Sequence, residues 1–75
     1  MISYDEDKRL SNLEKHGFDF VDAASVFEGF HLTREDSRGN YGEQRFQTLG
    51  LYGNVLVVMM IHTPRDSADH IISIR

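Results

Sequence analysis

Apolar residues recur with two different spacings along the chain, and the change of spacing separates a helical first third from a strand-rich remainder. On a helix of 3.6 residues per turn, Leu10 and Leu13 fall on one side. Acidic residues at positions 5–7 suit the positive end of such a helix, and Gly17 suits its end because glycine adopts the left-handed conformation without cost. The pattern therefore predicts a first helix that ends at about His16.

A second, shorter helix is predicted after this break. Asp19 is a good N-cap, and Glu28-Gly29 is a natural stop after Phe27. Between them the apolar residues share a helical spacing: Phe20, Ala23, Ala24, Val26 and Phe27. A short apolar piece before the first helix, residues 2–4, is predicted to be an edge strand.

From Phe30 onward the pattern is typical of strands. Strands are predicted at 31–34, 44–52, 55–61 and 69–75, with loops at 36–42 and 63–68 and a primed hairpin turn at Gly53-Asn54. The segment 55–61 (VLVVMMI) is apolar throughout, which predicts a central strand covered on both faces. The predicted fold class is α+β: an N-terminal β-α-α unit, then a meander of about four antiparallel strands, with the helices on one face.

This arrangement leaves the second face of the sheet without a cover. An apolar strand with one bare face exposes a large apolar patch, and such patches mark interaction sites. We therefore expect a partner, a second copy or a continuation of the chain past Arg75 to cover this face, and we expect the chain as given to self-associate or exchange elements.

Composition narrows the class of protein. The 75 residues predict one domain spanning 1–75, and the absence of cysteine and of a long apolar run favours a cytoplasmic protein without a membrane span. The net charge of −4 argues against a nucleic-acid binder, since such domains are usually basic. His31, His62 and His70 are too scattered for metal-ligand spacing, so neither a metal site nor a cofactor is predicted.

Four polar residues cluster on the side of the first helix opposite its leucines: Lys8, Asn12, Lys15 and His16. A solvated helix face is the simpler interpretation of such a strip. The alternative is a surface that grips a phosphate and moves a proton, because it combines two ammonium groups, an amide and an imidazole.

A set of motifs extends along nearly the whole chain: Tyr4-Asp5-Glu6-x-Lys8, Asn12, Lys15-His16-Gly17, Phe20, Ala23-Ala24, Val26-Phe27, Gly42-Glu43-x-Arg45, Gly50 and Ile71-Ile72-Ser73-x-Arg75. This set resembles that of the BrnT toxins, which are small ribonucleases of type II toxin–antitoxin systems. The chain departs from the family pattern at Ile74, where an alanine is usual. The C-terminal helix of the family has no counterpart after Arg75, so we expect a domain that lacks it.

The resemblance implies a RelE-like fold and an endoribonuclease that inhibits translation by cleaving RNA without a metal. It also implies a partner, a small BrnA-like antitoxin of the ribbon-helix-helix type. DNA would be contacted only through this antitoxin.

The chemistry of RNA cleavage limits which residues can take part. Arg45 and Arg75 are the best candidates for holding the phosphate, because guanidinium groups bind its oxygens bidentately. His16 can act as acid or base, or it can merely fix the helix end by a hydrogen bond. Glu43 is either a base or the partner of Arg45 in a surface ion pair.

The polar strip of the first helix supplies the predicted RNA contacts. Lys8, Lys15 and Asn12 would attract and bind the RNA backbone. The alternative function is a non-catalytic module that only forms complexes with an antitoxin or with itself, which the negative net charge favours.

Overall fold

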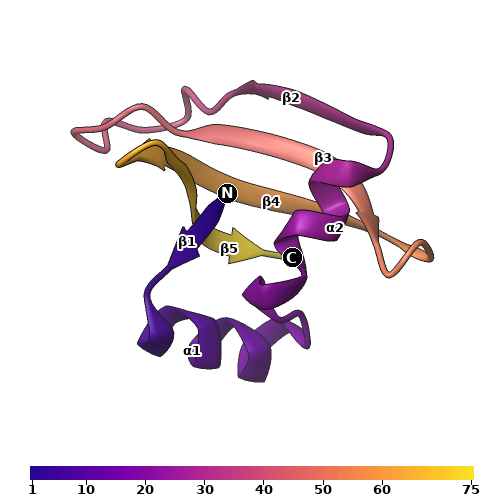
Figure 1. The fold of residues 1–75 in the computed structure, drawn as a ribbon. Coiled ribbons are helices and arrows are strands. Elements are labelled where there is room, and N and C mark those ends of the chain that lie inside the picture. The colour runs from indigo at the N-terminus through magenta and orange to yellow at the C-terminus, as the bar shows by residue number, and fades with distance from the viewer.

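A five-stranded sheet in the order β1-β5-β4-β3-β2 organises the computed structural model, which describes all residues 1–75 (Figure 1). The elements along the chain are β1 (Ile2–Tyr4), α1 (Glu6–His16), a 3₁₀ turn η1 (Phe20–Asp22), α2 (Ala23–Glu28), β2 (His31–Glu35), β3 (Phe46–Tyr52), β4 (Leu56–Arg65) and β5 (Ala68–Ile74). Strands β2 to β5 form an antiparallel meander, and β1 pairs in parallel with β5 at the edge. The predicted α+β class and meander are confirmed.

Helix α1 begins and ends where the sequence predicted. The Asp5 carboxylate accepts a hydrogen bond from the Asp7 amide at 3.0 Å, and Gly17 ends the helix with a φ of 77°. Its leucines, however, do not form a buried side, since Leu10 is 50% and Leu13 37% exposed. The only buried residue of α1 is Asn12. The prediction that Asn12 belongs to an exposed polar strip was therefore wrong.

Asn12 is buried because it completes the edge of the sheet. Strand β1 pairs only with residues 69–71, so the later part of β5 has no neighbouring strand on that side. The Asn12 side chain fills this place: its oxygen accepts from the Ile74 amide at 3.1 Å, and its nitrogen donates to the Ile74 carbonyl at 2.9 Å. The same nitrogen also donates to the Phe18 carbonyl at 3.1 Å. Helix α1 is thus fixed to β5 by one amide.

The core lies between the sheet and the segment that follows α1. The predicted second helix is divided into η1 and α2, and its fully buried residues Phe20, Ala23 and Val26 pack on β4 and β5. Their partners on the strands are Val58, Met60, Ile71 and Ile74. Helix α2 lies so close to β3 that a Cβ at Gly50 would be 2.8 Å from Val26 Cγ1. Only glycine allows this close packing at position 50.

Two hairpin turns connect the last three strands. Gly53 and Asn54 have φ values of 60° and 59°, as expected for the predicted primed turn. The prediction of a loop at 63–68 was wrong, because β4 continues to Arg65 and turns at Asp66-Ser67, where φ is 51° and 65°. Pro64 is tolerated in β4 because it lies beyond the last β3–β4 pair, Phe46 with His62, so no strand needs its missing amide.

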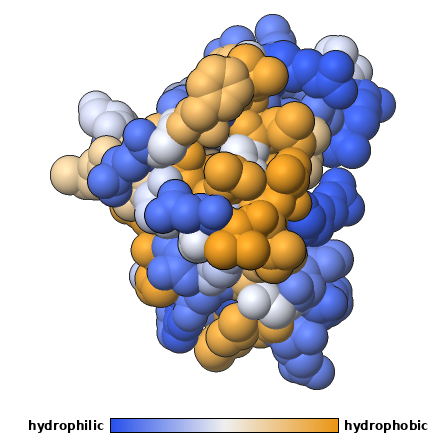
Figure 2. Space-filling model, turned by 90° about the vertical axis from the view of Figure 1, so that its right-hand side faces the viewer, coloured by the Kyte–Doolittle hydropathy of each residue, from blue (hydrophilic) through white to orange (hydrophobic).

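Near the β3–β4 hairpin, only one face of the central strand β4 is covered. Val58 and Met60 are buried beneath the helical segment, whereas Val57 is 67% exposed on the opposite face. The prediction of a strand covered on both faces was wrong for this part of β4, where the expectation of a bare second face is confirmed. Farther along the same face Ile61 is buried. We call this second surface the apolar face, formed by Phe30, Leu32, Leu49, Leu51, Val57 and Met59. Figure 2, which views the molecule from the side of the β3–β4 hairpin, shows apolar side chains gathered there.

No helix of the chain has the length and apolar character needed to cross a membrane.

His62 is a buried titratable residue in the core. Its Nε2 forms a 2.7 Å hydrogen bond with Thr48 Oγ1, while Nδ1 is buried without a hydrogen-bond partner. The ring stacks on Phe46 with centroids 5.9 Å apart. Burial lowers the pKa of His62 because a charged imidazolium is poorly solvated there, and the nearby Asp69 carboxylate offsets this only partly.

The lowered pKa of His62 predicts that stability falls in mild acid. The unfolded chain binds a proton at His62 more readily than the folded chain does, so the contribution of His62 is present above pH 6.5 and is lost as the pH falls below it. For each proton that the unfolded chain binds and the folded chain does not, the free energy of unfolding falls by at most about 1.4 kcal/mol for each unit by which the pH is lowered. Urea unfolding between pH 8 and pH 5 should show a steeper decline for the wild type than for His62→Gln. Equal declines would contradict this assignment.

Candidate functional site

Charged side chains from four parts of the chain line one hollow of about 170 Å³ at the start of α1. It is formed by the first turns of α1, the loop before β3, the end of β4, and β5. The residues that line it are Asp5, Lys8, Glu43, Arg45, Arg65, His70, Ile71 and Ile72. We call it the first hollow. It brings together the predicted residues Lys8, Glu43 and Arg45, and it adds Arg65 and His70.

The loop between β2 and β3 holds Arg45 in place. Its anchor is Asp36, whose buried carboxylate accepts from Arg38 Nε at 2.8 Å and from Arg38 Nη2 at 2.9 Å. The Arg38 guanidinium holds the pKa of Asp36 well below its usual range. At the other end of the loop, the Asp36 amide donates to the Arg45 carbonyl at 2.7 Å. The Arg45 guanidinium lies 4.1 Å from the centre of the Tyr41 ring, a cation–π contact that limits its movement.

Glu43 lies between two guanidinium groups. It accepts from Arg45 Nε at 3.1 Å and from Arg65 Nη2 at 3.3 Å. The hydrogen bond from Arg45, with further help from Arg65, lowers the pKa of Glu43. A carboxylate with a lowered pKa is a weak base, so this geometry suits the ion-pair interpretation of Glu43 better than the general-base one. Glu43 instead holds the two arginines beside each other.

His70 is the titratable ring of the first hollow. Its Nδ1 lies 2.9 Å from Ser3 Oγ, and Nε2 has no hydrogen-bond partner in the chain. Burial, with a further contribution from the Arg65 charge, lowers the pKa of His70. The ring is therefore mostly neutral at pH 7 and available to accept a proton.

A second hollow of about 150 Å³ continues along the other side of Lys8. It is lined by Lys8, Ser11, Asn12, Lys15, His16, Ile72 and Ser73. Lys8 and Ile72 line both hollows, so the two adjoin. We call them together the α1–β5 seam. Four cationic side chains and the two carboxylates of Asp5 and Glu43 border the seam, so it has a local excess of positive charge although the whole chain is negative. The cations are Lys8, Lys15, Arg45 and Arg65.

Arg75 lies outside this seam. Its backbone pairs with Met59 through hydrogen bonds of 2.6 and 2.9 Å, in the middle of β4. Arg45 instead precedes the Phe46–His62 pair, which is one end of the β3–β4 ladder, three pairs away from the Leu49–Met59 pair. This register separates Arg45 from Arg75, so the expectation that both bind one phosphate does not match the structure. The second arginine beside Arg45 in the first hollow is Arg65.

Arg65 and His70 were missed for a common reason. Both lie near the Asp66-Ser67 turn: Arg65 is in the predicted loop 63–68, and His70 is in the predicted strand 69–75, whose pairing with residues 60–65 was not predicted. A two-residue turn without glycine gives a weak sequence signal. Recognising it would have paired Thr63 with His70 and brought Arg65 to the same end of the sheet.

Comparisons with known proteins identify the family. A family model described as the ribonuclease toxin BrnT of type II toxin–antitoxin systems matches residues 4–75. The chain belongs to the BrnT family. Members of this family are ribonuclease toxins, and a type II system implies an antitoxin partner.

A solved structure supports the assignment. The crystal structure of the Brucella abortus ribonuclease toxin BrnT superposes with a TM-score of 0.75 and 29% sequence identity. The match covers 99% of this chain and 91% of that chain. A search of curated proteins gives no match. The BrnT resemblance expected from the sequence motifs is confirmed, and with it the two-helix, five-stranded fold.

Proposed function

We propose that this BrnT-family chain is a metal-independent endoribonuclease that binds RNA in the α1–β5 seam. It would inhibit translation by cleaving RNA in the cytoplasm and would be neutralised by a BrnA-like ribbon-helix-helix antitoxin. The observation that carries the proposal is the first hollow, where Lys8, Arg45 and Arg65 lie with His70. Three cations beside one imidazole supply the groups that phosphodiester cleavage needs, and they outnumber the two carboxylates of the hollow, Asp5 and Glu43.

The proposed reaction begins at the ribose 2′-hydroxyl. The unpartnered Nε2 of His70 takes the proton, and the hydroxyl oxygen attacks the adjacent phosphorus. Lys8, Arg45 and Arg65 stabilise the charge that develops on the phosphoryl oxygens. The bond from phosphorus to the 5′-oxygen breaks, leaving a 2′,3′-cyclic phosphate and a 5′-hydroxyl.

The leaving 5′-oxygen needs a proton, and His16 in the adjoining second hollow is the proposed donor. Lys15 contributes attraction to the RNA backbone beside it. Arg75 is proposed only as an RNA contact outside the seam, and Glu43 as a positioning residue for the arginines. Asn12 is given a structural role, because its amide is bonded to backbone atoms.

The test is RNA cleavage by the purified chain in buffer that contains a chelator. We expect cleavage to continue, with 2′,3′-cyclic phosphate ends, and His70→Gln to reduce the rate by about 10²–10⁴-fold. Because the neutral form of His70 is the base, the rate should rise with pH through a pKa below the ordinary value of 6.5. This acidic limb should disappear in His70→Gln.

Two results would overturn the proposal. Cleavage that appears only with an added divalent metal would exclude the metal-independent mechanism. Full activity of His70→Gln with an unchanged pH profile would remove His70 from it. Expression in cells without an antitoxin separates the toxin from the non-catalytic alternative, because only an active ribonuclease arrests growth.

A further inference from the structure

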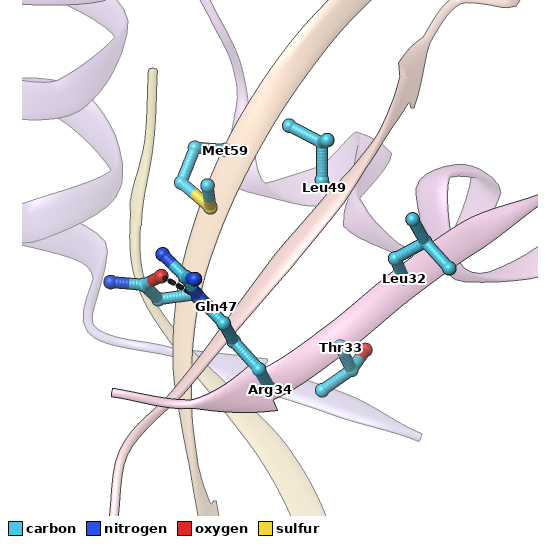
Figure 3. A pocket seen from close by; sticks show the side chains of 6 residues that line it. All are labelled: Leu32, Thr33, Arg34, Gln47, Leu49 and Met59. Carbon is cyan, nitrogen blue, oxygen red and sulfur yellow. Dashed lines mark hydrogen bonds between the residues drawn. The ribbon is translucent and has the colours of Figure 1, made fainter. Parts of the chain in front are cut away.

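The largest hollow of the molecule lies away from the seam, on the apolar face. It measures about 300 Å³ and is lined by Leu32, Thr33, Arg34, Gln47, Leu49 and Met59 (Figure 3). A neighbouring hollow, lined by Phe30, Leu32, Leu49, Gly50, Leu51 and Val57, extends it toward the β3–β4 hairpin. The two hollows share Leu32 and Leu49, so they form one continuous apolar surface over β2, β3 and β4.

Cations border this surface without a counter-charge. Arg34 donates from Nε to Gln47 Oε1 at 2.9 Å, alongside Gln47 in Figure 3, and it forms no salt bridge. No aspartate or glutamate lines either hollow. Arg75 pairs with Met59 through its backbone and also forms no salt bridge. The apolar face is therefore bordered by positive charge although the chain as a whole is negative.

This charge pattern discriminates between occupants. Two copies of the chain packed face to face would bring arginines of like sign together and supply no carboxylate to either. An occupant with apolar side chains flanked by carboxylates satisfies both the leucines and the arginines. Charge complementarity thus favours a different, acidic chain over a second copy.

The shape of the sheet indicates the form of the occupant. The opposite face already carries α2, which packs Ala23 and Val26 against the strands. On the apolar face, alternate residues of β3 such as Leu49 and Leu51 likewise present apolar side chains on which a helix can pack. A strip of about 13 Å, the reach of five strand residues, matches roughly nine residues of a helix.

We propose that the apolar face is the docking site of an acidic amphipathic helix from the antitoxin. That the occupant comes from the antitoxin depends on the proposed function. Its position and chemistry follow from the face itself. Gln47 lies two residues after Arg45, so the face continues along β3 toward the first hollow. A bound acidic helix would lower RNA affinity by bringing negative charge next to the seam.

The experiment uses two synthetic helical peptides of about 14 residues with the same leucine stripe. In one peptide the stripe is flanked by glutamates and in the other by lysines. Binding of each labelled peptide to the intact chain is measured by fluorescence anisotropy without RNA. We expect the glutamate peptide to bind at least about tenfold more tightly.

Variants locate the binding site. The double variant Leu49→Gln/Leu51→Gln should weaken the glutamate peptide by about tenfold or more. Val21→Gln, at a half-exposed valine of η1 on the other side of the sheet, should not weaken it. Arg34→Glu should reverse the preference, weakening the glutamate peptide and strengthening the lysine peptide.

Three results would overturn this inference: equal binding of both peptides, binding unaffected by the leucine variants, and self-association in sedimentation that the same variants abolish. The last would show that a second copy occupies the face. Because the binding assay contains no RNA, its failure would leave the ribonuclease proposal standing. A chain that binds the peptide but cleaves no RNA would instead disprove only the proposed ribonuclease activity.

Discussion

Replacing Asn12 with alanine is expected to cause the largest loss of stability of any alanine substitution in α1. The amide forms three buried or half-buried hydrogen bonds with backbone groups, which the variant leaves without partners: Ile74 N–H, Ile74 C=O and Phe18 C=O. An unsatisfied buried group costs about 1–3 kcal/mol, so we expect a loss of about 3–5 kcal/mol. A chain of this length typically has only about 4–11 kcal/mol of stability in total.

Urea unfolding followed by circular dichroism measures this effect. Leu13→Ala in the same helix is the matched control, because Leu13 is exposed and should lose less than about 1 kcal/mol. If Asn12→Ala were no worse than Leu13→Ala, the amide would not be what fixes α1 to β5.

Replacing Arg45 with alanine should have the largest effect on activity, if the chain cleaves RNA as proposed. Arg45 lies in the first hollow with Lys8 and His70, and its guanidinium is held by Tyr41 and Glu43. Removing a pre-positioned cation of this kind should lower the cleavage rate about 10²–10³-fold. Arg45→Lys should recover only part of the rate, since a lysine keeps the charge but loses the planar fork.

Arg34→Ala is the matched control for Arg45→Ala. Arg34 is an arginine of the neighbouring strand that lines the apolar face and lies outside the seam. The Arg34→Ala variant should cleave RNA at the wild-type rate. Both variants should unfold at nearly the same urea concentration as the wild type. Equal loss of activity in the two variants would indicate a general effect of positive charge and would remove Arg45 from the proposed site.

The parts of the fold that depend on local signals were predictable from the sequence. Gly17 and Gly53-Asn54 require left-handed backbone, which few other residues adopt, so the end of α1 and the β3–β4 turn followed from residue type. Pro64 gave a misleading signal. It reads as a loop residue, and its tolerance in β4 depends on where the neighbouring strand stops.

Contacts between distant residues were beyond the sequence patterns. The Asn12–Ile74 hydrogen bonds join residues 62 positions apart, so helical periodicity could not show that Asn12 is the buried side of α1. The first hollow is likewise formed by residues that are far apart in the sequence. Lys8 was identified from the polar side of the first helix and Arg45 from its phosphate-binding chemistry, whereas Arg65 and His70 join them only through the pairing of β4 with β5.

The attachment of α1 to β5 also constrains how the chain acquires its shape during synthesis. Strand β1 and helix α1 are made well before their backbone partners, which lie in residues 69–74. Loop-closure entropy makes such pairing of the two chain ends slow compared with hairpin formation. A nascent chain therefore lacks an assembled seam until β5 has left the ribosome.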